Sequence, residues 1–291
     1  MFTSVPGGFV PSEDQGIFLG IVQGPDGVSL GYTDEVIESI GETIGSIPQV
    51  EGYFAASGAA LEGAGPNRGM FFAKLKPWAD RGGKGEDVDS LLQQINGAFY
   101  QNQDAIAAGF NPPPIPGFSS TGGIELQFQD QTGGDYGIDD FLGNAREVLA
   151  TANAKEAIGG SASTQFTAGA PQLQIDLDRN QLEALNIDFQ EALTTIGATV
   201  GSQYVNEFTL GTRGYKVFLQ AQGDFRDSPE DLQSLYVRSR DGKMLPLGSI
   251  ATITPVTGPQ IIYHYNGFRT IKMQARQAEG FSSGQAIAAM N

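Results

Sequence analysis

Closely spaced carboxylates are the side chains of this sequence best suited to chemistry. Two carboxyl groups that flank a cleft can act as acid and base, as in glycoside hydrolysis. Each pair here also has a structural explanation: one stands at the start of an expected strand, one at a helix N-terminus favoured by the helix dipole, and one on a single face of a strand. We therefore expect no enzymatic activity. The pairs are Glu13 with Asp14, Asp139 with Asp140, and Asp176 with Asp178.

Other groups that commonly carry catalysis or bind cofactors are scarce. The chain has no Cys and a single His, His264, so a transition-metal site is not expected. Its 5 Met are scattered rather than clustered. The Gly-rich turns lack the Gly-Lys-Ser/Thr sequence of a phosphate-binding loop. The sequence therefore predicts neither a metal nor any other cofactor.

The composition is that of an acidic chain with enough apolar residues for folded domains. Its 291 residues include 17 Lys and Arg against 33 Asp and Glu, a net charge of −16, and 40% are hydrophobic. Such a charge argues against nucleic-acid binding, although it can also serve solubility alone. Residues 1–6 do not resemble a signal peptide, and no apolar run reaches the roughly 18 residues that span a bilayer. We expect a soluble chain of two or more compact domains.

The first part of the sequence predicts the order strand, helix, strand, strand, helix, strand. Apolar runs with strand character alternate with segments in which apolar residues recur at helical spacing. Thr33 is the expected N-cap of the first helix, Pro48 ends that helix, and the second helix is expected to begin near Glu86. The predicted strands cover residues 16–23, 50–56, 69–75 and 105–110.

A Pro-rich segment separates this part from a second copy of the same plan. Residues 112–118 contain four Pro, which removes backbone donors and favours a stiff linker. After it, residues 124–130 alternate like a strand, and a helix is expected to open at Asp139 or Asp140. This duplication indicates an α+β protein built from two ferredoxin-like βαββαβ subdomains. Further strands of the second copy are expected at residues 165–167 and 173–177.

The second copy is interrupted before its pattern is complete. Asp188 opens a new helix as a capping box with Glu191. Strands and a short helix capped at Ser228 follow, before a strand and a helix starting at Ser282 with Gln285 resume the plan. We interpret the interruption as an inserted α+β domain. The predicted parts are residues 10–111, the linker 112–118, residues 119–187, the insertion 188–258 and the returning segment 259–291.

Five motifs together resemble the resistance-nodulation-division (RND) efflux transporters of the hydrophobe/amphiphile type. Each motif alone is weak, but five in the family's order are a strong signal. The resemblance implies that residues 10–111 form one subdomain of the periplasmic porter region, that 119–187 and 259–291 form a second, and that 188–258 form the docking subdomain. The motifs are Glu13-Asp14-Gln15-Gly16, Leu75-Lys76-Pro77-Trp78-Ala79-Asp80-Arg81, Ile175-Asp176-Leu177-Asp178, Gly201-Ser202-Gln203-Tyr204-Val205-Asn206-Glu207-Phe208 and Tyr265-Asn266-Gly267.

The resemblance also implies a cleft that takes up amphiphilic small molecules, with a switch loop beside it. In the family this loop follows the second strand, and here it corresponds to residues 57–67. A Phe on a strand is usually a core residue, and a Gly-rich loop can be a plain solvent loop, so these roles rest on the resemblance. The expected substrate-binding residues are Phe54, Ala56, Ala59, Leu61 and Phe72, and the expected switch-loop residues are Ser57, Gly58, Gly63, Gly65 and Asn67.

Four positions depart from the pattern of the well-known multidrug pumps of this family. Ala59 and Leu61 stand where those pumps carry two Phe. Ala64 replaces a basic residue on the same loop, and Gly117 replaces an acidic residue at the mouth of the cleft. The pocket implied by the resemblance is therefore expected to be less aromatic here.

The resemblance further implies partners and a location. Such pumps are homotrimers that work with a periplasmic adaptor protein and an outer-membrane channel, and this chain corresponds to a periplasmic portion of an inner membrane protein. Protons flow through membrane-embedded residues that lie outside this chain, so the chain alone is not expected to transport. The alternative is a free-standing, non-catalytic binding or scaffold module with a porter-like fold.

Overall fold

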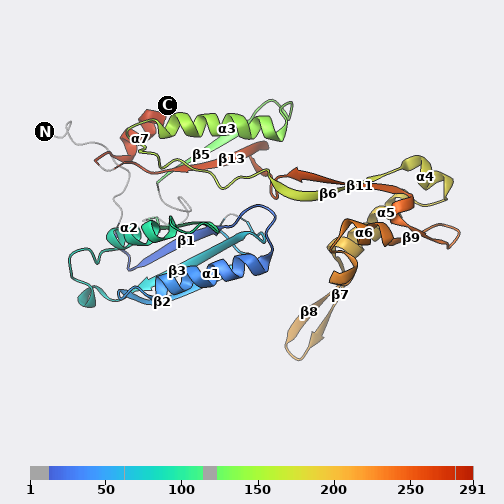
Figure 1. The fold of residues 1–291 in the computed structure, drawn as a ribbon, viewed down its shortest axis with the longest axis horizontal. Helices are drawn as coiled ribbons and strands as arrows, with labels where there is room; N and C mark the ends of the chain where they lie inside the picture. The colour runs from blue at the N-terminus through green and yellow to red at the C-terminus, as the bar shows by residue number, and fades with distance from the viewer. Residues whose placement is uncertain (1–12, 62, 114–122, 279, 291) are drawn as a thin grey trace. The chain divides into compact units, whose positions relative to one another are not determined.

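The computed structural model describes residues 13–61, 63–113, 123–278 and 280–290. Helices and strands are mixed along the chain and the sheets are small, so the fold is α+β, as predicted (Figure 1). The chain divides into two compact units: unit 1 is Met1–Ala170 with Gly258–Asn291, and unit 2 is Pro171–Thr257. Within unit 1 we distinguish a first lobe, residues 13–113, and a second lobe, residues 123–170 and 258–290. The finer domain boundaries stay predictions.

The first lobe has the predicted order of strands and helices. Its sheet has the strand order β2-β3-β1-β4, and every neighbouring pair is antiparallel. With one helix after β1 and one after β3, this is the order of a βαββαβ unit. The elements are β1 (Ile17–Gln23), α1 (Leu30–Gly45), β2 (Val50–Ser57), β3 (Arg68–Leu75), a 3-10 turn at Trp78–Asp80, α2 (Val88–Phe99) and β4 (Ile106–Phe110).

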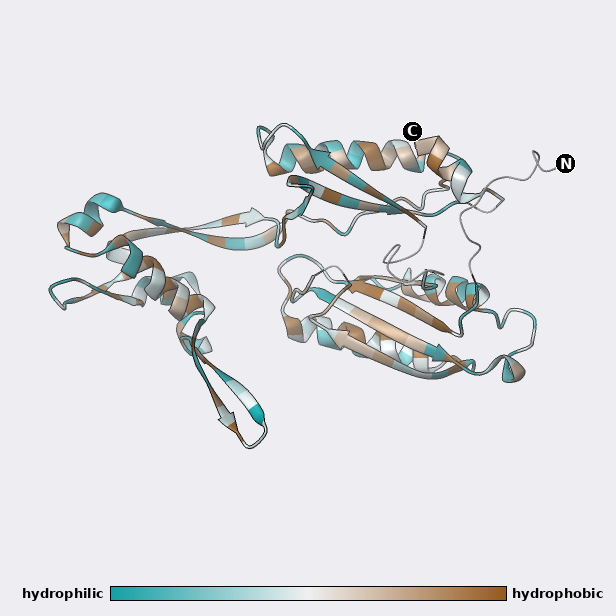
Figure 2. Cartoon of the chain, turned by 180° about the vertical axis from the view of Figure 1, so that it is seen from behind, coloured by the Kyte–Doolittle hydropathy of each residue, from teal (hydrophilic) through white to brown (hydrophobic). Residues whose placement is uncertain are grey.

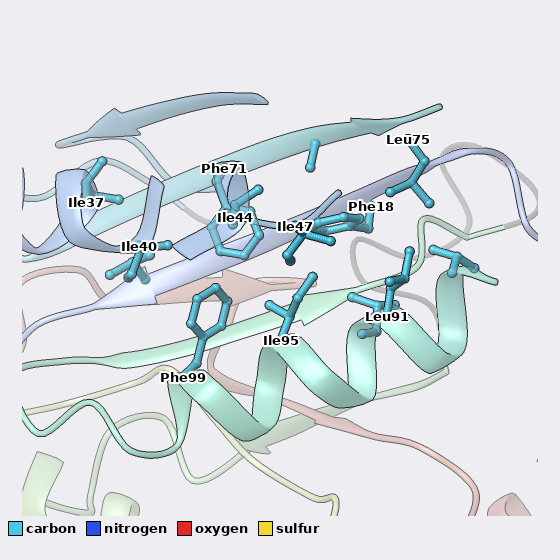
Figure 3. Packing of buried hydrophobic residues seen from close by; sticks show 14 of the residues in the cluster. Phe18, Ile37, Ile40, Ile44, Ile47, Phe71, Leu75, Leu91, Ile95 and Phe99 are labelled. Carbon is cyan, nitrogen blue, oxygen red and sulfur yellow. The ribbon is translucent and has the colours of Figure 1, made fainter. Parts of the chain in front are cut away.

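The core of the first lobe lies between the sheet and the two helices (Figure 3). Phe18 and Phe71, from the two central strands, are fully buried. The Phe71 ring meets the Phe18 and Phe99 rings edge-on, with centroids 6.3 and 5.6 Å apart. Gly20 makes room for it, because a Cβ there would lie 1.8 Å from Cζ of Phe71. The helices contribute Ile37, Ile40, Ile44, Leu91 and Ile95.

The start of α1 differs from the prediction. Its N-cap is Ser29, whose side-chain oxygen accepts a hydrogen bond from the amide three residues on, at 3.2 Å. Thr33 instead lies buried in the first turn, where its hydroxyl donates to the Pro66 carbonyl at 2.7 Å. The prediction of Thr33 as the cap is wrong. It placed the helix start just before the first buried apolar residue, Val36, but the helix begins about one turn earlier than this apolar stripe.

The second lobe contains a three-stranded antiparallel sheet in the order β12-β13-β5. The prediction of a strand at residues 165–167 is wrong, since the structure describes all three residues and places none of them in a strand. Next to them, Ser163 forms an isolated bridge to β13, and the Thr164 hydroxyl then donates to the Lys272 carbonyl at 2.7 Å. The Thr164 side chain thus occupies the Lys272 carbonyl, which would accept from a backbone amide if the strand continued. The elements are β5 (Ile124–Asp130), α3 (Ile138–Asn153), β12 (Tyr263–Tyr265), β13 (Phe268–Ala275) and α7 (Ser283–Met290).

At the N-termini of the second lobe's helices, the predicted cap is confirmed for α7 and wrong for α3. Ser282 and Gln285 exchange hydrogen bonds at the start of α7, at 2.8 and 3.2 Å, as predicted. The N-cap of α3 is Gly137, so the prediction of Asp139 or Asp140 as the cap is wrong. Both Asp lie in the first turn, where the helix dipole still favours a negative charge.

Unit 2 holds short helices and, among its described residues, three two-stranded sheets: β6–β11, β7–β8 and β9–β10. Asp188 caps α5, as predicted, by accepting from the amides of Gln190 and Glu191 at 2.9 and 3.2 Å. The return bond from the Asp188 amide to the Glu191 side chain, which would complete the predicted capping box, is not formed between these two described residues. Ser228 and Asp231 form a capping box at α6. The elements are β6 (Ala170–Leu177), α4 (Arg179–Ala184), α5 (Phe189–Ile196), a π-helical turn at Gly197–Gly201, β7 (Gln203–Leu210), β8 (Arg213–Leu219), α6 (Pro229–Ser234), β9 (Tyr236–Arg238), β10 (Met244–Pro246) and β11 (Ala251–Gly258).

Candidate functional site

The candidate site is the face of the first lobe's sheet opposite to α1 and α2, here called the open face. Residues alternate along a strand, so the neighbours of the core residues Phe18 and Phe71 point to this face. The strand register places Phe54, Phe72 and Leu19 in one row across β2, β3 and β1. Figure 2 shows stretches of hydrophobic residues along these strands. The next row of the open face consists of Ala56, Met70, Ile21 and Ala108.

Phe54 and Phe72 form an exposed aromatic pair on the open face. They are cross-strand partners, and 59% and 38% of their surface is exposed. Burying a Phe side chain fully contributes about 1.5–3 kcal/mol, so a bound apolar molecule could gain from covering both rings. The structure brings Phe54, Phe72 and Ala56 together on one face. Their role in binding stays a prediction.

The site prediction missed the residues that surround this pair on the sheet. Leu19, Ile21 and Met70 lie on the same face and are half-buried. Strand alternation could have found them, because each is next to a core position of β1 or β3 once Phe18 and Phe71 are assigned to the core.

The loop between β2 and β3 carries the other predicted site residues. Ala59 is half-buried and Leu61 is exposed. Gly58 and Gly63 adopt φ angles of +76° and +79°, a left-handed conformation that glycine adopts without steric cost. The described part of the loop therefore places a small and an aliphatic side chain next to the end of β2.

The two ends of this loop are fixed by hydrogen bonds. The Gly58 amide donates to the Arg68 carbonyl at 2.7 Å, and the Gly65 amide donates to the Gly58 carbonyl at 3.2 Å. Ser57 donates from its hydroxyl to Asp34 at 2.9 Å. Asn67, the last predicted switch-loop residue, is only 1% exposed, and its side chain donates to the Gly24 carbonyl at 3.3 Å, so it anchors this end of the loop.

Two of the sequence motifs meet in a buried ion pair. Both oxygens of Asp14 accept from the Arg81 guanidinium, at 2.6 and 2.7 Å. The amides of Gly16 and Val88 also donate to this carboxylate, each at 2.9 Å. The Arg81 side chain is 0% exposed and that of Asp14 is 9% exposed. Trp78 lies over the guanidinium, with 4.3 Å from its ring centroid to Cζ.

The ion pair shifts the titration of Asp14. Burial of the carboxyl raises its pKa, but the hydrogen bonds from Arg81, Val88 and Gly16 and the Arg81 charge outweigh this, so the pKa lies below its ordinary value. Asp14 is thus a charged anchor for the segment that follows β3. Its prediction as a residue at a strand start holds, but the partner 67 positions away was not foreseen.

The other carboxylates considered for catalysis have structural contacts. Asp178 caps α4 by accepting from the amides of the two residues that follow Arg179. Asp176 accepts from the Gln174 side chain at 2.9 Å. His264 lies on β12, opposite Arg269. Among the described residues, no group of three or more His, Cys, Asp or Glu is placed to hold a metal ion.

The helices in the described ranges are also informative about membranes. None of them combines the length and the apolar character that crossing a bilayer requires.

Comparison with known proteins decides the family. The model of the AcrB/AcrD/AcrF family matches residues 1–291, the whole length of the chain. The chain belongs to this family of RND efflux transporters. The resemblance inferred from the five motifs is therefore confirmed.

Individual relatives carry the names of drug and solvent exporters. The chain is 30% identical over 292 residues to the multidrug export protein AcrF of Escherichia coli (strain K12), covering 100% of this chain and 28% of AcrF. It is 31% identical over 290 residues to the multidrug/solvent efflux pump membrane transporter MepB of Pseudomonas putida, covering 99% of this chain and 27% of MepB. The multidrug resistance protein MdtF of Escherichia coli (strain K12) is 27% identical over 289 residues. The chain spans little more than a quarter of the length of these relatives.

The departures from the multidrug pattern of the family can now be placed. Ala59, Leu61 and Ala64 all lie on the loop between β2 and β3, and Leu61 and Ala64 are exposed. Gly117 lies outside the described residues. The open face therefore keeps the aromatic pair of its strands, while the adjoining loop contributes aliphatic side chains.

Proposed function

We propose that this chain forms the substrate-binding and docking part, located in the periplasm, of a proton-driven RND multidrug efflux pump. The exported compounds would be hydrophobic or amphiphilic. The observation that carries this proposal is the open face, where Phe54 and Phe72 are exposed side by side in a chain of the AcrB/AcrD/AcrF family. In this function the chain is not an enzyme and needs no cofactor.

The open face would bind by covering apolar surface rather than by matching polar groups. Aromatic rings add about 0.5–1.5 kcal/mol to area burial when a ligand ring stacks on them or meets them edge-on. With Ala59 and Leu61 on the loop, such contacts come from Phe54 and Phe72 on the strands. We expect binding to follow the hydrophobicity of a compound more than its aromatic content.

Unit 2 would supply the docking function. In this proposal the pump is a homotrimer, and unit 2 contributes to its assembly with a periplasmic adaptor protein and an outer-membrane channel. The β7–β8 hairpin supports such a role, because Phe208, Leu210 and Phe218 are exposed on it. Proton flow, and with it transport, would depend on parts of the pump outside this chain.

Drug susceptibility of cells that carry the full-length transporter tests the proposal. Phe54→Ala and Phe72→Ala should change the resistance profile, with the largest losses for the bulkiest amphiphiles. Tyr100→Ala is the matched control, since Tyr100 is an exposed aromatic residue of the same lobe, at the end of α2 and outside the sheet. Unchanged resistance in both Phe variants at equal expression would refute the assignment of the open face.

A further inference from the structure

Asp26 links the loop between β2 and β3 to the second lobe. This residue lies in the turn after β1, and one oxygen of its carboxylate has two partners. It accepts from the Thr167 hydroxyl of the second lobe at 2.8 Å and from the Asn67 side-chain amide at 3.4 Å. The bond to Thr167 is the shorter of the two and joins the two lobes, whereas the bond to Asn67 lies within the first lobe.

The loop end that Asp26 holds is tied to the first lobe by further bonds. The Gly24 amide donates to the Asn67 carbonyl at 2.8 Å, and the Asn67 side chain donates back to the Gly24 carbonyl at 3.3 Å. The Thr33 hydroxyl fixes the Pro66 carbonyl at 2.7 Å. A displacement of the turn that contains Asp26 would therefore carry this loop end with it.

A second strip of the second lobe contacts the same loop end. A Cβ at Gly63 would lie 2.7 Å from Cδ1 of Ile261, and a Cβ at Gly65 would lie 3.0 Å from the side-chain oxygen of Gln260. The loop backbone thus packs closely against residues 260–263. Along the chain, Thr167 precedes β6 and residues 260–263 follow β11, so both contacts adjoin the two strands that connect unit 1 with unit 2.

We propose that Asp26 is a positioning residue for this loop. Its carboxylate connects Thr167 of the second lobe to Asn67 at the end of the loop, so the position of the second lobe sets the position of that loop end. A shift of the second lobe therefore moves the segment with Ala59 and Leu61. The proposal rests on the proposed function, in which this segment contacts the exported compound. It adds that the contact is controlled from the second lobe, and that the Asp26 carboxylate is one of the links that carry this control, beside the packing of residues 260–263 against the loop.

Hydrogen exchange of the purified chain, read at the amides of Gly58, Gly65 and Arg68, tests the link. Asp26→Ala and Thr167→Val should speed exchange there about tenfold, the effect of losing one hydrogen bond to a charged group. Thr167→Ser keeps the hydroxyl and should restore slow exchange. Thr164→Val is the matched control, because Thr164 lies on the same segment but donates to Lys272 within its own lobe.

Two results would overturn the proposal. One is exchange at the loop amides that is unchanged in both Asp26→Ala and Thr167→Val, with amides of α2 serving as the reference for intact folding. The other is an equal increase in Thr164→Val, which would show a general loosening of the second lobe. Because no transported compound is present, failure here would leave the susceptibility test of the proposed function unaffected.

Discussion

Replacing Asp14 by Ala should strongly destabilise the first lobe. The substitution leaves the Arg81 guanidinium, whose side chain is 0% exposed, without its negatively charged partner. Removing one partner of a buried ion pair costs about 3–5 kcal/mol, because the remaining charge stays desolvated and uncompensated. The amides of Gly16 and Val88 lose an acceptor as well. Since domains are stable by only about 5–15 kcal/mol, much of the lobe's stability depends on this residue.

Urea unfolding followed by tryptophan fluorescence measures this loss. Trp78 is the single Trp of the chain, and its ring lies over Arg81, so the signal reports on the first lobe. Lys74→Ala is the control, because the Lys74–Glu51 pair has side chains that are 67% and 47% exposed. An exposed pair contributes about 0.2–1 kcal/mol. A loss below 1 kcal/mol in Asp14→Ala, similar to that of the control, would refute the reasoning.

The same pair gives a pH dependence with a definite sign. The pKa of Asp14 is lowered in the folded state, so folding is favoured by its ionised form. This contribution is fully present above the unfolded-state pKa, about 3.9, and is lost as the pH falls through the lower folded-state pKa. Asp14→Asn should therefore flatten the acid limb of the stability curve. A wild-type curve and a variant curve that stay parallel below pH 4 would contradict this.

Three further substitutions test other parts of the account. Gly20→Ala should destabilise the first lobe by about 1–3 kcal/mol in the same urea assay, because its Cβ would overlap the Phe71 ring. Gly52→Ala is the control, since nothing lies within 4 Å of the added Cβ. Equal stability of the two variants would contradict the close packing of Phe71 against Gly20. The Thr132 side chain and Arg269 lower the pKa of Asp130 from 3.8 to about 2, so the stability that this carboxylate contributes should fall as the pH drops from about 4 to 2. Thermal unfolding of Asp130→Asn should lack that decline. An identical decline in the variant would show that Asp130 is not its source. Leu61→Phe should tighten binding of aromatic amphiphiles to the full-length transporter by about 0.5–1.5 kcal/mol, and an unchanged affinity in a fluorescence titration would show that the loop does not contact them.

Local patterns predicted the elements well, because each depends on residues close in sequence. The apolar spacing of residues 36–47 and 88–99 identified the helices α1 and α2, and alternation identified β5 and β6. The cap of α1 was misplaced because Ser29 and Thr33 are both good cap residues one turn apart. The false strand at residues 165–167 failed for a different reason, since the hydroxyl of Thr164 makes the bond that a backbone amide would have made.

The candidate site was only partly predictable, because its arrangement depends on long-range pairing. The family motifs pointed to Phe54 and Phe72, but the strand register that sets them opposite each other follows from the fold. The contact of Asp14 with Arg81 joins positions 67 residues apart, and no local periodicity encodes it. The link from Asp26 to Thr167 spans 141 residues and needs both lobes in place.

Photo-cross-linking of an amphiphile to the full-length transporter in membranes tests the central claim most directly. If the open face binds exported compounds, a photoreactive hydrophobic probe should label peptides of β2 and β3, and unlabelled substrate should compete. Labelling should fall in the Phe54→Ala, Phe72→Ala double variant and stay unchanged in Tyr100→Ala. The exposed apolar residues of the β7–β8 hairpin offer the competing surface on this chain. Labelling confined to that hairpin, or unaffected by the double variant, would contradict the account.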